Sequence, residues 1–122
     1  MQDEKLIHDW MVSHLKHKLS RDYKDIHINL NGEKKNEFKG HYPDLILGNH
    51  GLVLAVMEIE TEKSVTPEKA DEWSRIVGTA LGVKLIIMVP KPLKAKTVEL
   101  LWQKGIADRT SVGSYEINIA MP

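Results

Sequence analysis

The stretch that decides the fold reads YPDLIL at residues 42–47 and, after a polar turn, continues to VMEIET at residues 56–61. Both segments are apolar enough to be buried strands, yet Asp44 opens the first and Glu58 and Glu60 close the second. Removing an unpaired carboxylate from water is expensive unless a cation or hydrogen-bond donors compensate it. Three carboxylates on one sheet therefore predict a site for a divalent metal ion.

The spacing of the acids predicts how they are arranged. Side chains alternate along a strand, so Glu58 and Glu60 should point to the same face, roughly 7 Å apart, and their neighbours to the other face. Asp44 can lie opposite Glu58 only if the hairpin has a longer loop or a bulge. A tight turn over 48–51 would place Asp44 opposite Ala55 instead.

An apolar stripe leads into the two glutamates. Leu52, Leu54 and Val56 precede them on the same predicted strand face, which fits a strand that runs into a cleft. The alternative places Asp44 in a turn at the mouth of a strand and the two glutamates on a solvated face. Spacing alone leaves both interpretations open.

The chemistry of such ligands indicates the metal. Carboxylate oxygens suit Mg²⁺ or Mn²⁺ rather than Zn²⁺, because hard cations prefer carboxylates, carbonyls and water. Close carboxylates repel one another, so without a metal ion one of them should have a raised pKa. A bound Mg²⁺ can lower the pKa of a water molecule and stabilise charge on a phosphodiester, which is the chemistry of a metal-dependent nuclease.

Hydrophobic periodicity and turn residues divide the chain into helices and strands. They predict a helix over 3–19, strands over 23–30, 42–47 and 52–60, a helix over 66–81, a strand over 85–89, a helix over 91–104 and a strand over 111–119. This order predicts one α/β domain over residues 1–122, with helices on both faces of a mixed sheet. A helical crossover should make the strands at 52–60 and 85–89 parallel.

Composition narrows the class of protein. The chain has 122 residues, no apolar run long enough for a membrane span, and no signal peptide at its start. It contains no cysteine, which excludes disulfides and thiolate metal sites and makes the cytoplasm the default compartment.

Charge is balanced overall but not along the chain. There are 17 basic and 17 acidic side chains, so global charge does not indicate nucleic-acid binding. Basic residues crowd one stretch, however: Lys16, Lys18, Arg21, Lys24, Lys34, Lys35 and Lys39. They form either a solvated helix end with a lysine-rich hairpin or a rim that faces phosphates.

At the three acids the chain resembles the PD-(D/E)XK nuclease superfamily. Pro43 and Asp44 match the "PD", and residues 58–60 occupy the (D/E)XK tripeptide. The predicted order of elements matches the αβββαβ core of that superfamily over about residues 3–90, with an extra C-terminal helix and strand. The resemblance implies a restriction-endonuclease-like fold in which Asp44 and Glu58 bind Mg²⁺, while the third motif position activates or orients the attacking water.

The chain departs from the motif at that third position. Glu60 stands where the motif has lysine, although some restriction endonucleases of this fold also carry glutamate there. The Glu-Thr ending at residues 60–61 also resembles a small prokaryotic subgroup of the fold. Many members use a further glutamate on the first helix. Glu4 is the candidate for that role here, with a solvated acid as the alternative.

The resemblance implies an endonuclease that hydrolyses DNA phosphodiester bonds with Mg²⁺ or Mn²⁺. Asp44, Glu58 and Glu60 are then the metal-binding and catalytic residues. Basic residues near the site would contact the nucleic acid: Lys34, Lys35, Lys39, His41, Lys63 and Lys69. Lys63 and Lys69 are the nearest candidates to supply the missing positive charge.

Two alternatives remain at this point. The missing lysine motivates a nuclease-fold module that has weak or no catalytic activity and binds nucleic acid or protein. A structural subunit without any site is the other. A chain of this length offers little surface to DNA, so we also expect a homodimer.

Other residue types give weaker signals. The histidines of the first helix have a spacing that fits a solvated face better than a zinc site: His8, His14 and His17. Each tryptophan falls on an apolar helical stripe, which favours core packing over base stacking: Trp10, Trp73 and Trp102. Ser64 has no His–Asp pair that would make it a nucleophile.

Overall fold

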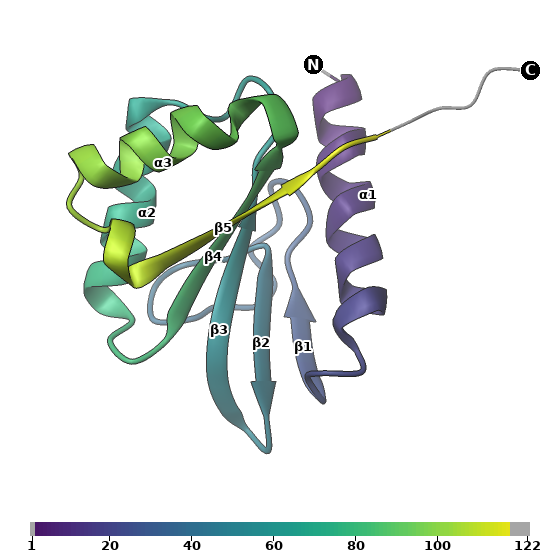
Figure 1. Ribbon diagram of the computed structural model, residues 1–122. Coiled ribbons are helices and arrows are strands. Elements are labelled where there is room, and N and C mark those ends of the chain that lie inside the picture. The colour runs from purple at the N-terminus through teal and green to yellow at the C-terminus, as the bar shows by residue number, and fades with distance from the viewer. Residues whose placement is uncertain (1, 118–122) are drawn as a thin grey trace, which may run out of the picture.

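A computed structural model describes residues 2–117 and contains one five-stranded mixed sheet with helices on both faces (Figure 1). The strands lie in chain order, β1-β2-β3-β4-β5; β1, β2 and β3 pair antiparallel, whereas β3, β4 and β5 pair parallel. The elements are α1 (Gln2–Leu19), β1 (Asp25–Ile28), β2 (Leu45–Asn49), β3 (Leu52–Ile59), α2 (Pro67–Thr79), β4 (Lys84–Pro90), α3 (Lys94–Gln103) and β5 (Thr110–Tyr115). This confirms the predicted α/β class, the order of elements and the parallel pairing of β3 with β4.

Each face of the sheet has its own apolar core. On one face α1 packs over β1, β2 and β3, and this core contains Met11, Val12 and Leu15 of the helix. On the other face α2 and α3 cover β3, β4 and β5, with Trp73 fully buried in that core. Alternate residues of β3 divide between the two, as the strand period predicts.

The register of the β2–β3 hairpin brings Asp44 beside Glu58. His50 and Gly51 form the two-residue turn, both with positive φ (53° and 79°), as turns between twisted antiparallel strands require. The register then shifts at Leu47/Gly48, and Leu45 pairs with Met57. Continued by one residue, this pairing sets Asp44 opposite Glu58. The bulge that the sequence argument required is present.

Gly48 makes the bulge possible, because a Cβ at this position would collide with the backbone carbonyl of Leu52. We expect Gly48→Ala to destabilise the protein by about 1–3 kcal/mol, the usual cost of overpacking. Gly78 provides the matched control. It is exposed on α2 with nothing near its Cβ position, so Gly78→Ala should stabilise by about 0.5–1 kcal/mol. Urea denaturation of both variants tests this, and equal stabilities would contradict it.

The bulge also corrects the predicted apolar stripe. Leu52 and Leu54 are exposed, whereas Val53 packs with Val56 against the core beneath α2. The extra residue of the bulge shifts the phase of the strand, so the side chains before it exchange faces. The stripe predicted from strict alternation was therefore wrong at Leu52 and Leu54.

Two tryptophans are also not where the sequence placed them. Trp73 is buried as predicted, but Trp10 is 56% exposed and Trp102 is 70% exposed. Both lie on helices whose buried stripe is narrower than the apolar pattern. Trp10 instead stacks on His14 at a centroid distance of 5.0 Å.

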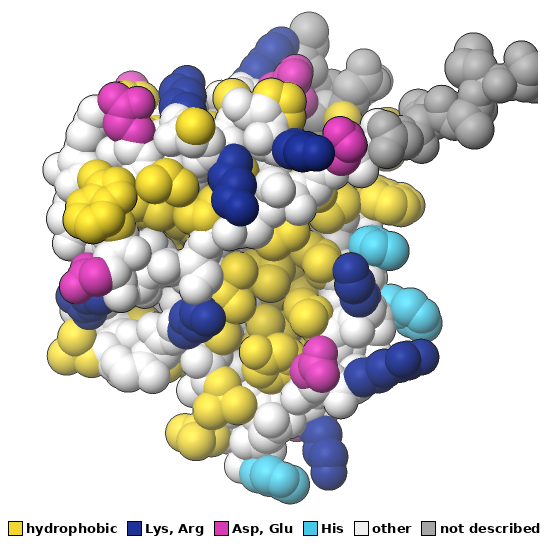
Figure 2. Space-filling model, in the orientation of Figure 1, with side chains coloured by type: hydrophobic (Ala, Val, Ile, Leu, Met, Phe, Trp, Pro, Cys, Tyr) yellow, Lys and Arg dark blue, Asp and Glu magenta, His cyan; other side chains and the backbone are white. Residues whose placement is uncertain are grey.

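The sheet is not covered evenly. Hydrophobic side chains gather over the middle of the face in Figure 2, between α3 and α1. Ile86 and Met88 of β4 lie on the α1 side of the sheet and are half-buried.

The last strand was predicted over 111–119, and in the structure it ends at Tyr115. Residues 118–119 of that prediction lie outside the described part of the chain. Within residues 2–117, no helix is both long and apolar enough to cross a bilayer.

Candidate active site

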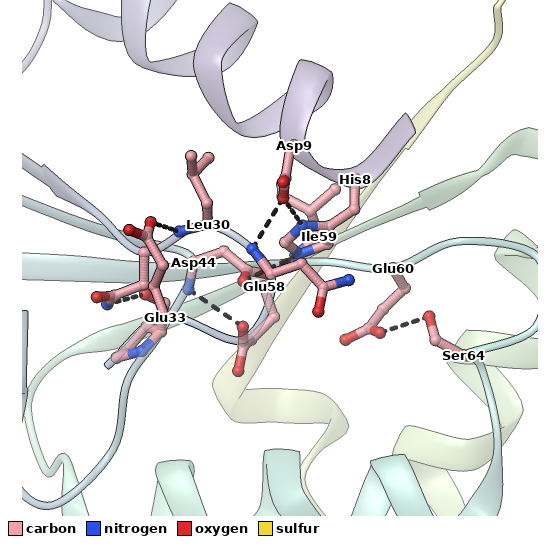
Figure 3. A network of polar contacts seen from close by, with 12 residues as sticks. His8, Asp9, Leu30, Glu33, Asp44, Glu58, Ile59, Glu60 and Ser64 are labelled. Atoms are coloured by element: carbon pink, nitrogen blue, oxygen red, sulfur yellow. Dashed lines mark hydrogen bonds and ion pairs between the residues drawn. The ribbon is translucent and has the colours of Figure 1, made fainter. Parts of the chain in front are cut away.

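The three predicted acids border one cavity of about 450 Å³. Its floor is formed where β2 begins and β3 ends. α1 contributes one wall, the loop at residues 30–42 a second and α2 a third. In Figure 3, Leu30 and Glu33 of the loop lie on one side of Asp44 and Glu58, and Ser64 lies on the other.

Asp44 and Glu58 are held together by the hairpin backbone. The Asp44 amide donates a hydrogen bond to Oε2 of Glu58 (3.3 Å), and the Ile59 amide donates to Oδ2 of Asp44 (2.7 Å). Glu58 is only 8% exposed. Burial, then the charges of Asp44 and Glu60, raise the pKa of Glu58 well above its ordinary value. The raised pKa expected for one of the close carboxylates is therefore found at Glu58.

Glu60 lies in a different environment, although it shares the strand face of Glu58. Its carboxylate is buried, and Ser64 Oγ donates to Oε1 (2.7 Å) while the Trp73 indole donates to Oε2 (3.0 Å). Burial raises the pKa of Glu60, against the opposing effects of Lys69, Ser64 and Trp73. Both oxygens of Glu60 thus already have donors.

Lys69 supplies a positive charge beside these acids. Its ammonium lies 4.0 Å from Oε1 of Glu60 and 3.2 Å from Oε2 of Glu72. Burial lowers its pKa, but the charges of Glu60, Glu58 and Glu72 outweigh burial and raise it. Thr66 positions the residue locally, because its hydroxyl caps α2 by accepting from the Lys69 amide (3.1 Å).

Lys63 and Glu4 meet at the edge of the same region. Lys63 is exposed, and its backbone amide donates to Oε1 of Glu4 (3.1 Å). Glu4 lines the cavity and is half-buried. Of the two lysines proposed from the sequence, the structure brings only Lys69 to the carboxylates.

His8 belongs to the site, and its prediction as part of a solvated face was wrong. The side chain is 12% exposed, with Nε2 3.0 Å from Oδ1 of Asp44 and Nδ1 2.9 Å from Oδ1 of Asp9. Burial lowers the His8 pKa, but hydrogen bonds to Asp44 and Asp9 outweigh it and raise the pKa to about 9. His14 and His17 are exposed as predicted.

The loop at residues 30–42 is fixed by buried Asn29. Its side-chain amide donates to the carbonyls of Asn36 and Pro43, and its Oδ1 accepts from the amides of Lys35 and Asn36. His41, which lines the cavity, contacts Thr79 of α2 (2.8 Å between Nε2 and Oγ1). The loop also carries three exposed lysines: Lys34, Lys35 and Lys39.

The donor set fits a hard divalent cation. Within residues 2–117, no group of three His, Asp or Glu side chains is already arranged to hold a metal ion. Mg²⁺ does not need such a cage, because it usually binds through one or two carboxylates and completes its shell with water and substrate phosphates. Asp44 and Glu58 provide that pair. A negative charge on the buried Glu58 carboxylate lowers the stability of the fold unless a cation balances it.

Sequence reasoning missed several partners of the acids. Ser64 and Trp73 hydrogen-bond to Glu60, but their separation along the chain gave no sign of it. For His8 a signal existed, since His8, Met11 and Leu15 follow the spacing of a buried helical face. Asn29 could not be identified, because its partners come from a loop without regular structure.

Comparisons with known proteins found no significant match to this chain. No family model matches it, and neither a curated protein nor a solved structure does so significantly.

The raised pKa of Glu58 predicts how pH affects the metal-free protein. The folded state keeps a proton that the unfolded chain releases above the ordinary pKa of 4.5, so this group stabilises the fold fully only below that value. The contribution is lost as pH rises through the raised pKa. We expect Glu58→Gln to raise the melting temperature at pH 8, by roughly 3–6 °C for each kcal/mol added to the free energy of unfolding. The difference in melting temperature between the variant and the unaltered protein should narrow toward pH 4.5.

Thermal unfolding with a chelator at several pH values measures this. Glu62→Gln is the control, because Glu62 is exposed on the following turn. Adding Mn²⁺ should stabilise the unaltered protein but not the Glu58→Gln variant. A gap that does not depend on pH would contradict the prediction.

Proposed function

We propose that this protein is a Mg²⁺- or Mn²⁺-dependent nuclease of PD-(D/E)XK type that hydrolyses DNA phosphodiester bonds. The observation that carries the proposal is the pairing of buried Glu58 with half-buried Asp44 on the cavity floor, where burial and neighbouring acids raise the pKa of Glu58. Carboxylates placed together in this way favour a divalent cation.

The charge of the whole cavity supports a cation as well. Six carboxylates line it, against Lys69, Arg75 and His8, whose pKa is raised to about 9. A phosphate group would be repelled by this surface unless bound cations reversed its charge. The acids on the floor are therefore suited to bind metal first and a phosphodiester afterwards.

Within this proposal each residue has its own role. Asp44 and Glu58 would hold the metal, which stabilises the negative charge that develops on the phosphate. Glu60 would position Lys69, whose ammonium lies 4.0 Å from its Oε1, while it also accepts from Ser64 and Trp73. The Lys69 ammonium then takes the place of the motif lysine that this chain lacks at position 60, and stabilises charge near the attacking water.

His8 keeps Asp44 in place from the helix side. Its ring lies between Asp44 and Asp9, and Asp9 also accepts from the Asn31 amide (2.8 Å). This chain of contacts joins α1 to the loop at residues 30–42. Groups that orient a metal ligand commonly contribute 10–100-fold to affinity or activity.

One observation favours the alternative of an inactive binding module. Both oxygens of Asp44 have partners, in His8 and the Ile59 amide, as do both oxygens of Glu60. A carboxylate with two partners can serve a structural role without any metal. The two proposals differ in whether metal binding and cleavage occur together.

A cleavage assay distinguishes the nuclease from the binding module. The purified protein is incubated with single-stranded, duplex and branched DNA in the presence of Mg²⁺, Mn²⁺ or chelator. The nuclease proposal expects cleavage of at least one DNA with either metal and none with chelator. Metal binding by calorimetry without cleavage of any DNA would favour the binding module. Failure to bind metal or nucleic acid at all would refute the nuclease proposal and leave only a binding module for protein.

A further inference from the structure

The carboxylates of the candidate site lie deep between fixed walls. Glu58 is 8% exposed and Glu60 is 1% exposed. The loop at residues 30–42 forms one wall and is tied down at separate points, by Asp9 to the Asn31 amide and by His41 to Thr79 of α2. A phosphodiester must therefore pass between these walls to reach the floor.

This depth matters for the form of the nucleic acid. In a duplex the backbone lies on the surface of a wide rod, with the bases stacked inside. Enzymes that act on a base in a pocket take single strands or extrude the nucleotide from the duplex, and we apply the same reasoning to a phosphate that must reach this floor. A cavity of about 450 Å³ between fixed walls gives room to one strand rather than two.

The rim of the cavity carries a surface for unpaired bases. Tyr42 lines the cavity, is 36% exposed, and has the Lys34 ammonium 5.8 Å from its ring centroid. On the same loop Lys39 lies 5.8 Å over the ring of Phe38. Aromatic rings combined with cations are the usual means of binding single strands, because every base has a face that can stack.

Tyr42 also lies close to the reacting position. It precedes Asp44 by two residues, which span at most about 7 Å of backbone. Arg75 of α2 lines the cavity as well and can contact a phosphate. A strand entering between the loop and α2 could thus stack one base on Tyr42 and place a neighbouring phosphate over Asp44 and Glu58.

We propose that the site takes an unpaired strand of nucleic acid, with Tyr42 as the base-stacking residue at its entrance. This inference rests on the proposed nuclease function and specifies its substrate class. The duplex part of a substrate would remain outside the cavity, and single-stranded DNA, overhangs or unpaired ends would enter it.

Fluorescence anisotropy with labelled DNA tests the inference separately from catalysis. The protein is used unaltered with Ca²⁺, which binds carboxylate oxygens and takes the place of the metal that supports cleavage. The probes are one single-stranded DNA, its blunt duplex and the single-stranded RNA of the same sequence. We expect the single strand to bind at least tenfold more tightly than the duplex. Tyr42→Ala should weaken single-strand binding about 5- to 100-fold, as loss of one base–aromatic stack does.

Two control variants make the result specific. Tyr42→Phe keeps the ring and loses only the hydroxyl, which contacts Oε1 of Glu37 (3.3 Å), so it should retain single-strand binding. Trp102→Ala removes an exposed aromatic ring on α3 outside the cavity and should change nothing. Equal loss from Trp102→Ala would show a non-specific aromatic effect and overturn the inference.

The outcomes for substrate class and for catalysis can be told apart. Equal or tighter binding of duplex, or no effect of Tyr42→Ala, overturns the inference even if the unaltered protein cleaves duplex with metal. Tyr42-dependent binding of single strands by a protein that cleaves nothing supports the inference and refutes the nuclease function. Equal binding of RNA supports the inference too, because the stacking face of a base is the same.

Discussion

Asp44→Asn is expected to reduce metal-dependent cleavage roughly 1,000-fold, equivalent to about 4 kcal/mol of lost charge stabilisation in the transition state. The variant keeps an oxygen that can accept the Ile59 amide hydrogen bond, so the hairpin should remain folded. It removes the charge that a divalent cation needs. Initial rates on a DNA that the unaltered protein cleaves, at saturating Mn²⁺, provide the measurement.

The matched control for Asp44→Asn is Asp25→Asn. Asp25 also accepts a hydrogen bond from a backbone amide, that of Gly51 (2.8 Å), at the far end of the antiparallel part of the sheet. Its replacement should leave cleavage within about twofold, since surface changes away from a site are usually small. If Asp44→Asn cleaves as fast as the unaltered protein while remaining folded, Asp44 is not part of the active site.

Trp73→Ala should have the largest effect on stability. Trp73 is fully buried in the core beneath α2, and its indole donates to Glu60. Truncating a buried aromatic residue costs about 3–5 kcal/mol. Trp73→Phe keeps most of the packing but removes the donor to Oε2 of buried Glu60, at a cost of about 1–3 kcal/mol.

Urea denaturation followed by circular dichroism measures both tryptophan variants. Trp102→Phe is the control, and it should change stability by less than about 0.5 kcal/mol because Trp102 is exposed. Combining Trp73→Phe with Glu60→Gln should cost less than the sum of the two, since each removes one partner of the same hydrogen bond. Full additivity would show that the bond does not stabilise the fold.

The fold could be predicted from the sequence where the signal was local. Thr66 and Pro67 marked the start of α2, and the apolar run at 85–89 marked a strand, although its Ile86 and Met88 face is only half-buried. The bulge at Leu47/Gly48 could not be located in this way, because it depends on how two strands meet. Its effect extends to every side chain before it on β3, which is why the apolar stripe was misplaced.

In the candidate site, too, local features could be predicted from the sequence and tertiary contacts could not. Asp44, Glu58 and Glu60 could be identified from their cost in apolar strands and from motif spacing. The roles of the two glutamates could not, because they depend on partners distant in the sequence. Glu58 lies beside Asp44 with a raised pKa, whereas Glu60 accepts from Ser64 and Trp73. Only the tertiary structure separates them.

The most direct test of the metal site proposed at Asp44 and Glu58 is an anomalous-difference map from a crystal soaked in Mn²⁺. We expect a peak between the carboxylates of Asp44 and Glu58, about 2.0–2.3 Å from an oxygen of each. Crystals of Glu58→Gln should show no such peak. Glu60 should remain bonded to Ser64 and Trp73. A peak elsewhere, or none at any Mn²⁺ concentration the crystals tolerate, would contradict the metal site on which the proposed nuclease function depends.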